Sequence, residues 1–322
     1  MPASPMPPVE RASSMHTMQC MEVWGGNHAA DNGVVMPGLS AWVFSRPYHD
    51  QAAGGDVHYV SSCGTGRIAR VVLADVSGHG EQVAGIARRL QRLMRRYINY
   101  LDQTTFVQAL NREFSSDEST RFATSLTITY FGPSHTLDVC NAGHPRPLWY
   151  RAQQRRWELL VPPPAGAREA ESAEVRNLPL GVLEPTRYEQ FGIRLRPGDM
   201  VLLYTDGVTE SRSPTGELLG EPGLIEMVAS IDAGQPGDLV NALVERLANW
   251  RGQREGDDDL TILLLHHDGR AVMAPLHKRL LASLRMLGIM ARHLVPFGDR
   301  PPVPWPEWRR ENLLGAFRAA GK

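Results

Sequence analysis

The chain has 322 residues, of which 42% are hydrophobic and 21% are charged. This composition supports one large globular domain or two small ones and excludes a fibrous or wholly disordered protein. The 34 Lys and Arg nearly balance the 35 Asp and Glu, so the net charge of −1 gives no whole-chain electrostatic case for binding nucleic acid. The charge is uneven, because residues 270–322 carry ten Lys and Arg against three acidic residues, about +7, which leaves about −8 on residues 1–269.

Residues 1–19 are rich in Pro, Ser and Met without any period, which predicts a disordered leader. They lack the apolar core of a signal peptide, and no run approaches the roughly 18 apolar residues of a membrane span. The three cysteines, Cys20, Cys63 and Cys140, have no metal-ligand spacing, so neither a zinc site nor a disulfide framework is expected. We therefore expect a cytoplasmic protein.

Periodicity and turn residues predict the secondary structure of the rest of the chain. In chain order, the predicted elements are strands at Leu39–Ser45, Val57–Ser62 and Ile68–Ala74; helices at Gln82–Leu101 and from Thr104 or Thr105 to Phe114; strands at Phe122–Phe131, Thr136–Cys140, Leu148–Arg151, Glu189–Leu195 and Met200–Tyr204; helices at Leu224–Ser230 and Leu239–Trp250; and a last strand at Leu260–His266. This order lacks the strand–helix alternation of a parallel sheet, so the sequence predicts an α+β fold with antiparallel sheets.

The predicted helix Gln82–Leu101 has an apolar stripe at alternating steps of four and three residues. Such a stripe packs either on a partner helix, as in a homodimer, or on the sheet of its own chain. The sequence leaves both alternatives open.

Four aspartates each stand where a strand-like run meets a Gly or acidic turn. They are Asp56, Asp75, Asp206 and Asp258. Any one of them, taken alone, is an ordinary turn residue. If the strands are adjacent, however, each close pair of carboxylates costs on the order of 4 kcal/mol at an effective dielectric near 20. Such a cluster requires divalent cations or Lys/Arg partners, and no Lys precedes Lys278.

Six motifs recur in a fixed order along the chain. They are GGD at 54–56, ADVSGHG at 74–80, NAGHPRPL at 141–148, LPLGV at 178–182, GDMVLLYTDGVTE at 198–210 and DDLT at 258–261. This series resembles the PPM family of metal-dependent protein serine/threonine phosphatases, and within it the SpoIIE/RsbU branch. The resemblance implies a β-sandwich of two antiparallel sheets flanked by helices, here spanning residues 20–268.

The resemblance also implies a centre with two Mn²⁺ or Mg²⁺ ions. By motif, Asp75 would bridge the two ions, while Asp56 and the backbone carbonyl of Val76 complete the shell of one. Asp206 and Asp258 would hold the other, with Asp258 chosen as the first Asp of DDLT over Asp257 and Asp259. Oxygen ligands suit these cations, and a water between two of them can attack a phosphoryl group without any nucleophilic side chain.

Two histidines near these motifs remain without an assigned role. Eukaryotic members of the family have a His two residues after the bridging Asp, whereas this chain has Ser77 there and His79 farther on. A general-acid role for His79 is therefore left open. His144, next to Gly143, is expected to be a loop histidine.

The resemblance implies hydrolysis of phosphoserine or phosphothreonine on a regulatory protein, with a phosphorylated STAS-domain anti-sigma antagonist as the usual substrate of this branch. The alternative from another class is a pseudophosphatase that docks a phosphoprotein without turnover, and its mark would be a missing ligand Asp. A nuclease is disfavoured because the body of the chain is acidic.

Residues 269–322 lie beyond the resemblance. Their excess of Lys and Arg and the near-helical spacing of their leucines predict a basic, helical C-terminal extension. A basic amphipathic helix can bind an acidic partner, contact a membrane surface, or fold back on the acidic body of its own chain. We expect this extension to act in docking and not in the chemistry.

Overall fold

The computed structural model describes residues 15–18, 22–62, 68–78, seven positions between 83 and 93, and then 102–115, 121–163, 175–232, 235–252 and 258–270. Most of the predicted leader at residues 1–19 and nearly all of the predicted extension at 269–322 lie outside these ranges. The two domain boundaries therefore stay predictions, although His16 and Thr17, at the end of the predicted leader, form a short strand and are not disordered. Within the described ranges, no helix is long and apolar enough to cross a membrane.

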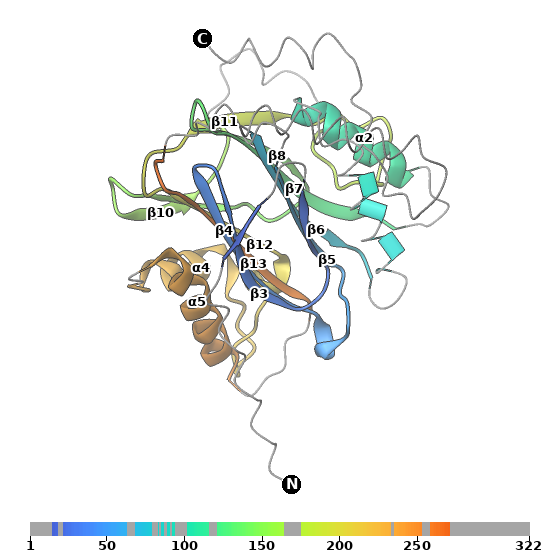
Figure 1. Ribbon diagram of the computed structural model, residues 1–322. Helices are drawn as coiled ribbons and strands as arrows, with labels where there is room; N and C mark the ends of the chain where they lie inside the picture. The colour runs from blue at the N-terminus through green and yellow to red at the C-terminus, as the bar shows by residue number, and fades with distance from the viewer. Residues whose placement is uncertain are drawn as a thin grey trace, which may run out of the picture.

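Two stacked sheets form the centre of the molecule (Figure 1). The seven-stranded sheet has the order β1 (His16–Thr17), β3 (Ala30–Met36), β4 (Leu39–Arg46), β13 (Leu260–His267), β12 (Met200–Tyr204), β9 (Leu148–Arg151) and β10 (Arg156–Leu159). The six-stranded sheet has the order β11 (Gln190–Arg194), β8 (Thr136–Ala142), β7 (Ala123–Phe131), β6 (Ile68–Val76), β5 (Asp56–Ser62) and β2 (Val23–Gly26). Every pairing of neighbours is antiparallel except that of β1 with β3. The predicted α+β class is confirmed.

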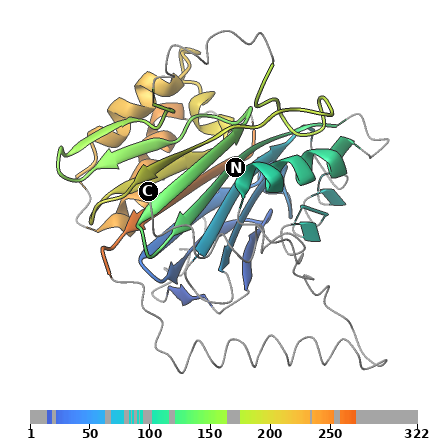
Figure 2. The same ribbon diagram turned by 90° about the horizontal axis from the view of Figure 1, so that it is seen from above.

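Helices cover the outer faces of the two sheets (Figure 2). Helix α2 (Gln103–Ser115) packs on β7 and β8 of the six-stranded sheet. Helices α4 (Gly220–Ala229) and α5 (Pro236–Arg251) pack on the seven-stranded sheet. A short helix, α3 (Asp206–Thr209), follows β12, and a 3₁₀ turn spans Tyr48–Asp50. The result is a helix–sheet–sheet–helix sandwich, as the sequence predicts.

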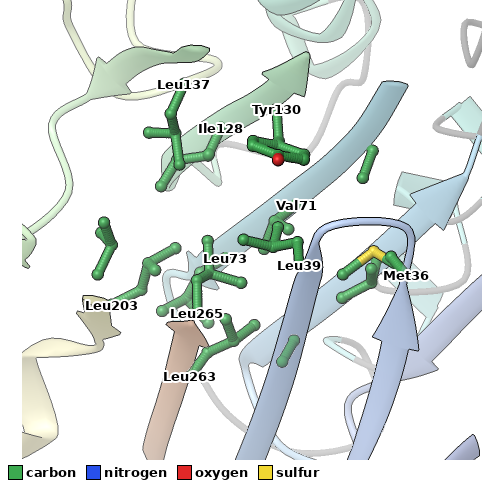
Figure 3. Packing of buried hydrophobic residues seen from close by; sticks show 14 of the residues in the cluster. Met36, Leu39, Val71, Leu73, Ile128, Tyr130, Leu137, Leu203, Leu263 and Leu265 are labelled. Atoms are coloured by element: carbon green, nitrogen blue, oxygen red, sulfur yellow. The ribbon is translucent and has the colours of Figure 1, made fainter. Parts of the chain in front are cut away.

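The core between the sheets follows the period-two alternation of each strand. On β6, Val71 and Leu73 point into the space between the sheets, whereas Val72 and Ala74 face the helical layer. Figure 3 shows the inner cluster, in which Val71 and Leu73 meet Leu203 and other residues of the opposite sheet. The same alternation assigns the next odd-numbered residue of β6, Asp75, to the inner face.

The predicted helix Gln82–Leu101 lies largely outside the described residues. Three described members, Val83, Leu90 and Leu93, are buried in the cluster that also holds Phe106 and Leu110 of α2. These contacts favour the alternative in which the stripe packs on its own chain, because the described apolar positions already have partners there. A homodimer through Gln82–Leu101 stays a prediction.

The predicted start of the second helix, after Thr104 or Thr105, is wrong. Helix α2 begins at Gln103, because Asp102 caps it. The Asp102 Oδ1 atom accepts the N–H of Thr105 at 2.7 Å and the hydroxyl of Thr104 at 2.7 Å. A carboxylate that accepts a free N–H of the first turn is a strong N-cap. Asp102 is therefore the N-cap residue, and the two threonines lie inside the helix.

Candidate metal centre

Three polar side chains form a row across the six-stranded sheet at the end of its inner face. Asp56 on β5 lies directly opposite Asp75 on β6, and Asp75 lies directly opposite Thr124 on β7. Opposed residues of an antiparallel pair share one face and lie roughly 5 Å apart at Cβ, so the three side chains are neighbours. Asp56 is only 3% exposed. The core of the sandwich therefore ends in one buried carboxylate, Asp56, and one half-buried carboxylate, Asp75, at this edge.

The opposite sheet contributes hydroxyl groups that reach across to this row. Thr205, which follows β12, donates its hydroxyl to Asp56 Oδ2 at 2.8 Å. The Thr205 oxygen in turn accepts the N–H of Thr261 on β13 at 3.0 Å. Both threonines are fully buried, so these bonds fix the rotamer of Asp56 and join the two sheets at the site.

The neighbours Asp258 and Asp259 have different environments. Asp259 is 7% exposed, and its two carboxylate oxygens accept the N–H groups of Tyr48, at 2.6 Å, and of Gly55. A Cβ atom on Gly54 would lie 2.6 Å from Asp259 Oδ1, so the glycine turn fits closely over this carboxylate. Asp258 is exposed, and its Oδ1 accepts the N–H of Asp259. Asp259 thus holds the turn that precedes Asp56, whereas Asp258 lies at the surface of the site; Asp257 is outside the described residues.

The protonation equilibria show that the predicted aspartates share one electrostatic environment. Burial, followed by the charge of Asp75, raises the pKa of Asp56 well above its usual value. Burial raises the pKa of Asp75 to about 7, with further contributions from the charges of Asp206 and Asp258. Burial also raises the pKa of Asp206. The fold therefore brings Asp75 within electrostatic reach of Asp56, Asp206 and Asp258, although these residues are far apart in sequence.

Two further groups belong to this environment. The carbonyl oxygen of Val76 lies beside Gly55, since a Cβ atom on that glycine would be 2.9 Å from it. Glu210 follows Asp206 by four residues, and its charge raises the pKa of both Asp206 and Asp75. Glu210 is not among the residues predicted from the sequence, although a carboxylate four residues after another at a helix start is a signal that the sequence contains.

The donor set suits a hard divalent cation. Among the residues that the structure describes, no Lys or Arg forms an ion pair with Asp56, Asp75 or Asp206. The negative charge that raises these pKa values is therefore not offset by such pairs, and all the donors are oxygen atoms, which Mg²⁺ and Mn²⁺ prefer. Among the described residues, no three His, Cys, Asp or Glu side chains lie close enough together to form a preassembled metal site. The roles of these residues as metal ligands are therefore a proposal, which is given below.

The two histidines of the sequence analysis have different outcomes. His79 lies outside the described residues. His144 lies in the loop after β8, as expected, and at 5% exposure it is buried there. Its imidazole Nδ1 lies 2.8 Å from the hydroxyl of Thr124, the neighbour of Asp75.

Comparison with known proteins decides the family. Residues 65–268 match the family described as "Stage II sporulation protein E (SpoIIE)". The chain belongs to the SpoIIE family. The matched range contains Asp75, Asp206 and Asp258 and begins after Asp56.

Among curated proteins, this SpoIIE-family chain is similar to "Phosphoserine phosphatase RsbU" of Bacillus subtilis (strain 168). The two are 25% identical over 221 residues, which cover 67% of this chain and 59% of RsbU. The chain thus spans about three fifths of the length of that relative.

Solved structures of similar fold include two phosphatase-related proteins. The RsbU and RsbW domains of Rv1364c from Mycobacterium tuberculosis align with a TM-score of 0.60 and 24% identity, over 80% of this chain and 70% of that one. The PP2C phosphatase domain of SpoIIE from Bacillus subtilis, solved with a fragment of its regulatory domain, aligns with a TM-score of 0.58 and 15% identity, over 71% and 63%. The SpoIIE-family chain therefore has the PP2C fold, and its family is one of serine/threonine phosphatases.

Proposed function

We propose that this chain is a metal-dependent protein serine/threonine phosphatase. The observation that carries the proposal is that Asp75 lies directly opposite the buried Asp56 and within electrostatic reach of Asp206 and Asp258. Among the described residues, no Lys or Arg forms an ion pair with Asp56, Asp75 or Asp206, and the chain belongs to the SpoIIE family. A pair of divalent cations, Mn²⁺ or Mg²⁺, would neutralise this charge.

The side chains have distinct roles in this proposal. Asp75, in the middle of the row, would bridge two ions, and Asp56 with the Val76 carbonyl would complete one ion's shell. Asp206 and Asp258 would hold the second ion. When bound, two such ions supply an acidified water and hold the oxygens of a phosphoryl group.

Other residues of the chain keep these ligands in place. Thr205 orients Asp56 through its hydroxyl. Asp259 holds the glycine turn through the Gly55 N–H. Since both oxygens of Asp259 already accept backbone N–H groups, the exposed Asp258 is better placed to contact an ion. The role of His79 stays open.

The proposed substrate is phosphoserine or phosphothreonine on a cytoplasmic regulatory protein, and the STAS-domain anti-sigma antagonists are the candidate class. The name of the similar RsbU, a phosphoserine phosphatase, supports this choice of phosphoamino acid. In this proposal, residues 20–268 form the phosphatase domain and the basic residues 269–322 serve in docking. The pseudophosphatase alternative is less well supported, since none of the four predicted aspartates is missing.

Turnover by the full chain tests the proposal. We expect para-nitrophenyl phosphate and a phosphoserine peptide to be hydrolysed with Mn²⁺ or Mg²⁺ and not in excess EDTA. Asp206→Asn should remove this activity, whereas Asp31→Asn, a matched change at an exposed aspartate of β3, should keep it. Binding of the phosphopeptide without turnover would support the pseudophosphatase instead, and full activity in EDTA would refute the metal mechanism.

A further inference from the structure

The loop Asn141–His144 carries His144 into the space between the sheets. The Asn141 Oδ1 atom accepts the N–H of His144 at 2.7 Å, and its Nδ2 donates to the His144 carbonyl at 2.8 Å. Gly143 adopts a φ of +70° between them, a conformation that favours glycine. The side-chain amide therefore closes the loop on itself, and the imidazole is presented from a rigid support.

The first contact of the imidazole is to the six-stranded sheet. Its Nδ1 lies 2.8 Å from the Thr124 hydroxyl, and Thr124 lies directly opposite Asp75. Burial lowers the pKa of His144 to about 3, so the ring is neutral at physiological pH. With Nδ1 as the acceptor, the Thr124 hydroxyl donates its hydrogen to His144, and the ring proton is on Nε2.

The second contact is to the seven-stranded sheet. The backbone of Tyr204, at the end of β12, lies close enough to the imidazole to raise its proton affinity, which partly opposes the effect of burial. Nε2 forms no full hydrogen bond with the described residues, so this contact is weaker than the one to Thr124. Tyr204 precedes Asp206 by two residues.

His144 thus touches both sheets at the edge that carries the carboxylates. We propose that His144 is a positioning residue that ties the Asp75 half of the metal centre to the Asp206 half. It does so through Thr124 on one side and the Tyr204 backbone on the other. The Thr205–Asp56 bond is a parallel link between the same two sheets. With both links in place, the separation of the two halves is fixed before a cation binds, so less ordering is required on binding.

This inference rests on the proposed function, and it is tested by metal binding in the full chain without reference to turnover. The probe is Mn²⁺, followed by calorimetry and by the metal-induced rise of the thermal midpoint. We expect His144→Ala and Thr124→Val each to weaken Mn²⁺ binding about tenfold or more, as the loss of a group that supports a ligand typically does. His144→Gln, which fills more of the volume, should weaken binding as well, so the test does not depend on the alanine variant folding.

Coupling between the two residues separates positioning from general packing. If His144 acts through Thr124, the double variant His144→Ala/Thr124→Val should bind Mn²⁺ about as weakly as the worse single variant. His267→Ala is the matched control, because His267 is 1% exposed, contacts the Tyr130 hydroxyl and lies at the far end of β13. It should lower the thermal midpoint without metal and keep the Mn²⁺ affinity of the wild type.

Each outcome decides between the two proposals. A wild type that binds Mn²⁺ together with His144 variants of equal affinity overturns the positioning role alone. The positioning role is also overturned if His267→Ala weakens Mn²⁺ binding as much as His144→Ala does, or if the losses from His144→Ala and Thr124→Val simply add. A wild type that does not bind Mn²⁺ or Mg²⁺ overturns the proposed function itself, and the positioning role with it.

Discussion

Asp56 and Asp75 face each other as directly opposed residues of β5 and β6. Two acidic side chains at opposed positions destabilise a sheet, whereas apolar pairs stabilise it. Asp75 ends the inner face of β6, where the preceding residues Ala69, Val71 and Leu73 are apolar, so a valine would fit the local pattern of this strand better. The site therefore weakens the fold in which it is built, as expected where function and stability are in conflict.

The first prediction follows from this conflict. The folded-state pKa of Asp75, about 7, lies above its unfolded value of 3.8. The contribution of this group to stability is therefore fully present below pH 3.8 and is lost as the pH rises through about 7. At pH 8 without metal, Asp75→Asn should raise the free energy of unfolding by on the order of 1–4 kcal/mol, measured by urea denaturation.

The same variant should lose the stabilisation that Mn²⁺ gives to the wild type. Asp31→Asn, at an exposed position on β3, is the matched control and should change neither quantity. An Asp75→Asn protein that is less stable than the wild type in EDTA would show that the carboxylate supports the fold.

The second prediction concerns Thr205. Thr205→Val keeps the shape of the side chain but leaves Asp56 Oδ2 and the Thr261 N–H without their buried partner. We expect a loss of about 1–3 kcal/mol in the free energy of unfolding, because each unsatisfied buried group incurs its desolvation cost. Thr205→Ser retains the hydroxyl and should recover most of the loss. Equal stability of the Val and Ser variants in urea would contradict this role.

The third prediction separates the two neighbouring aspartates. Asp259→Asn should destabilise the fold by about 1–3 kcal/mol. The carboxylate accepts two backbone N–H groups, one on each oxygen, whereas an amide has only one oxygen that can accept. Asp258→Asn should leave the unfolding transition nearly unchanged and weaken Mn²⁺ binding. The two measurements are urea denaturation and calorimetry. The reverse pattern would make Asp259 the ligand and would contradict the choice of Asp258.

The strands that the sequence predicts well are those whose own residues favour a buried strand. The predicted Leu260–His266 and Ile68–Ala74 match β13 and β6 within two residues, since both consist mostly of apolar residues and lie beside acidic or glycine turns. Strands β1, β2, β3 and β10 were missed. Strand β2 ends in Gly25 and Gly26, and β3 includes Asp31, Asn32 and Gly33, residues of low strand propensity. These two segments are strands because β5 and β4 offer a partner edge, which local sequence does not report.

The site shows the same division. The ligand candidates Asp56, Asp75 and Asp206 were selected because they stand in a fixed order within the six motifs, a signal that the sequence contains. Thr205 was not selected, because its function depends on a bond to a residue 149 positions away. His144 was correctly expected in a loop, but its burial was not expected. Its burial comes from Thr124 and Tyr204, on two different sheets, and nothing in the sequence around Gly143 indicates that contact.

The fourth prediction uses the burial of His144. Its folded-state pKa, about 3, lies below the unfolded value of 6.5, because burial disfavours the imidazolium. The stability that the neutral ring contributes is therefore complete above pH 6.5 and is lost as the pH falls from 6.5 towards 3. At pH 5 this loss amounts to about 2 kcal/mol.

His144→Gln cannot be protonated, so the difference in unfolding free energy between pH 7 and pH 5, measured in urea without metal, should change by about 2 kcal/mol relative to the wild type. Asp75 responds to pH in the opposite direction, but it is present in both proteins and largely cancels in the comparison. Identical pH dependence in the two proteins would show that His144 takes up a proton as readily in the fold as in the unfolded chain, and would contradict a neutral imidazole that accepts the Thr124 hydroxyl.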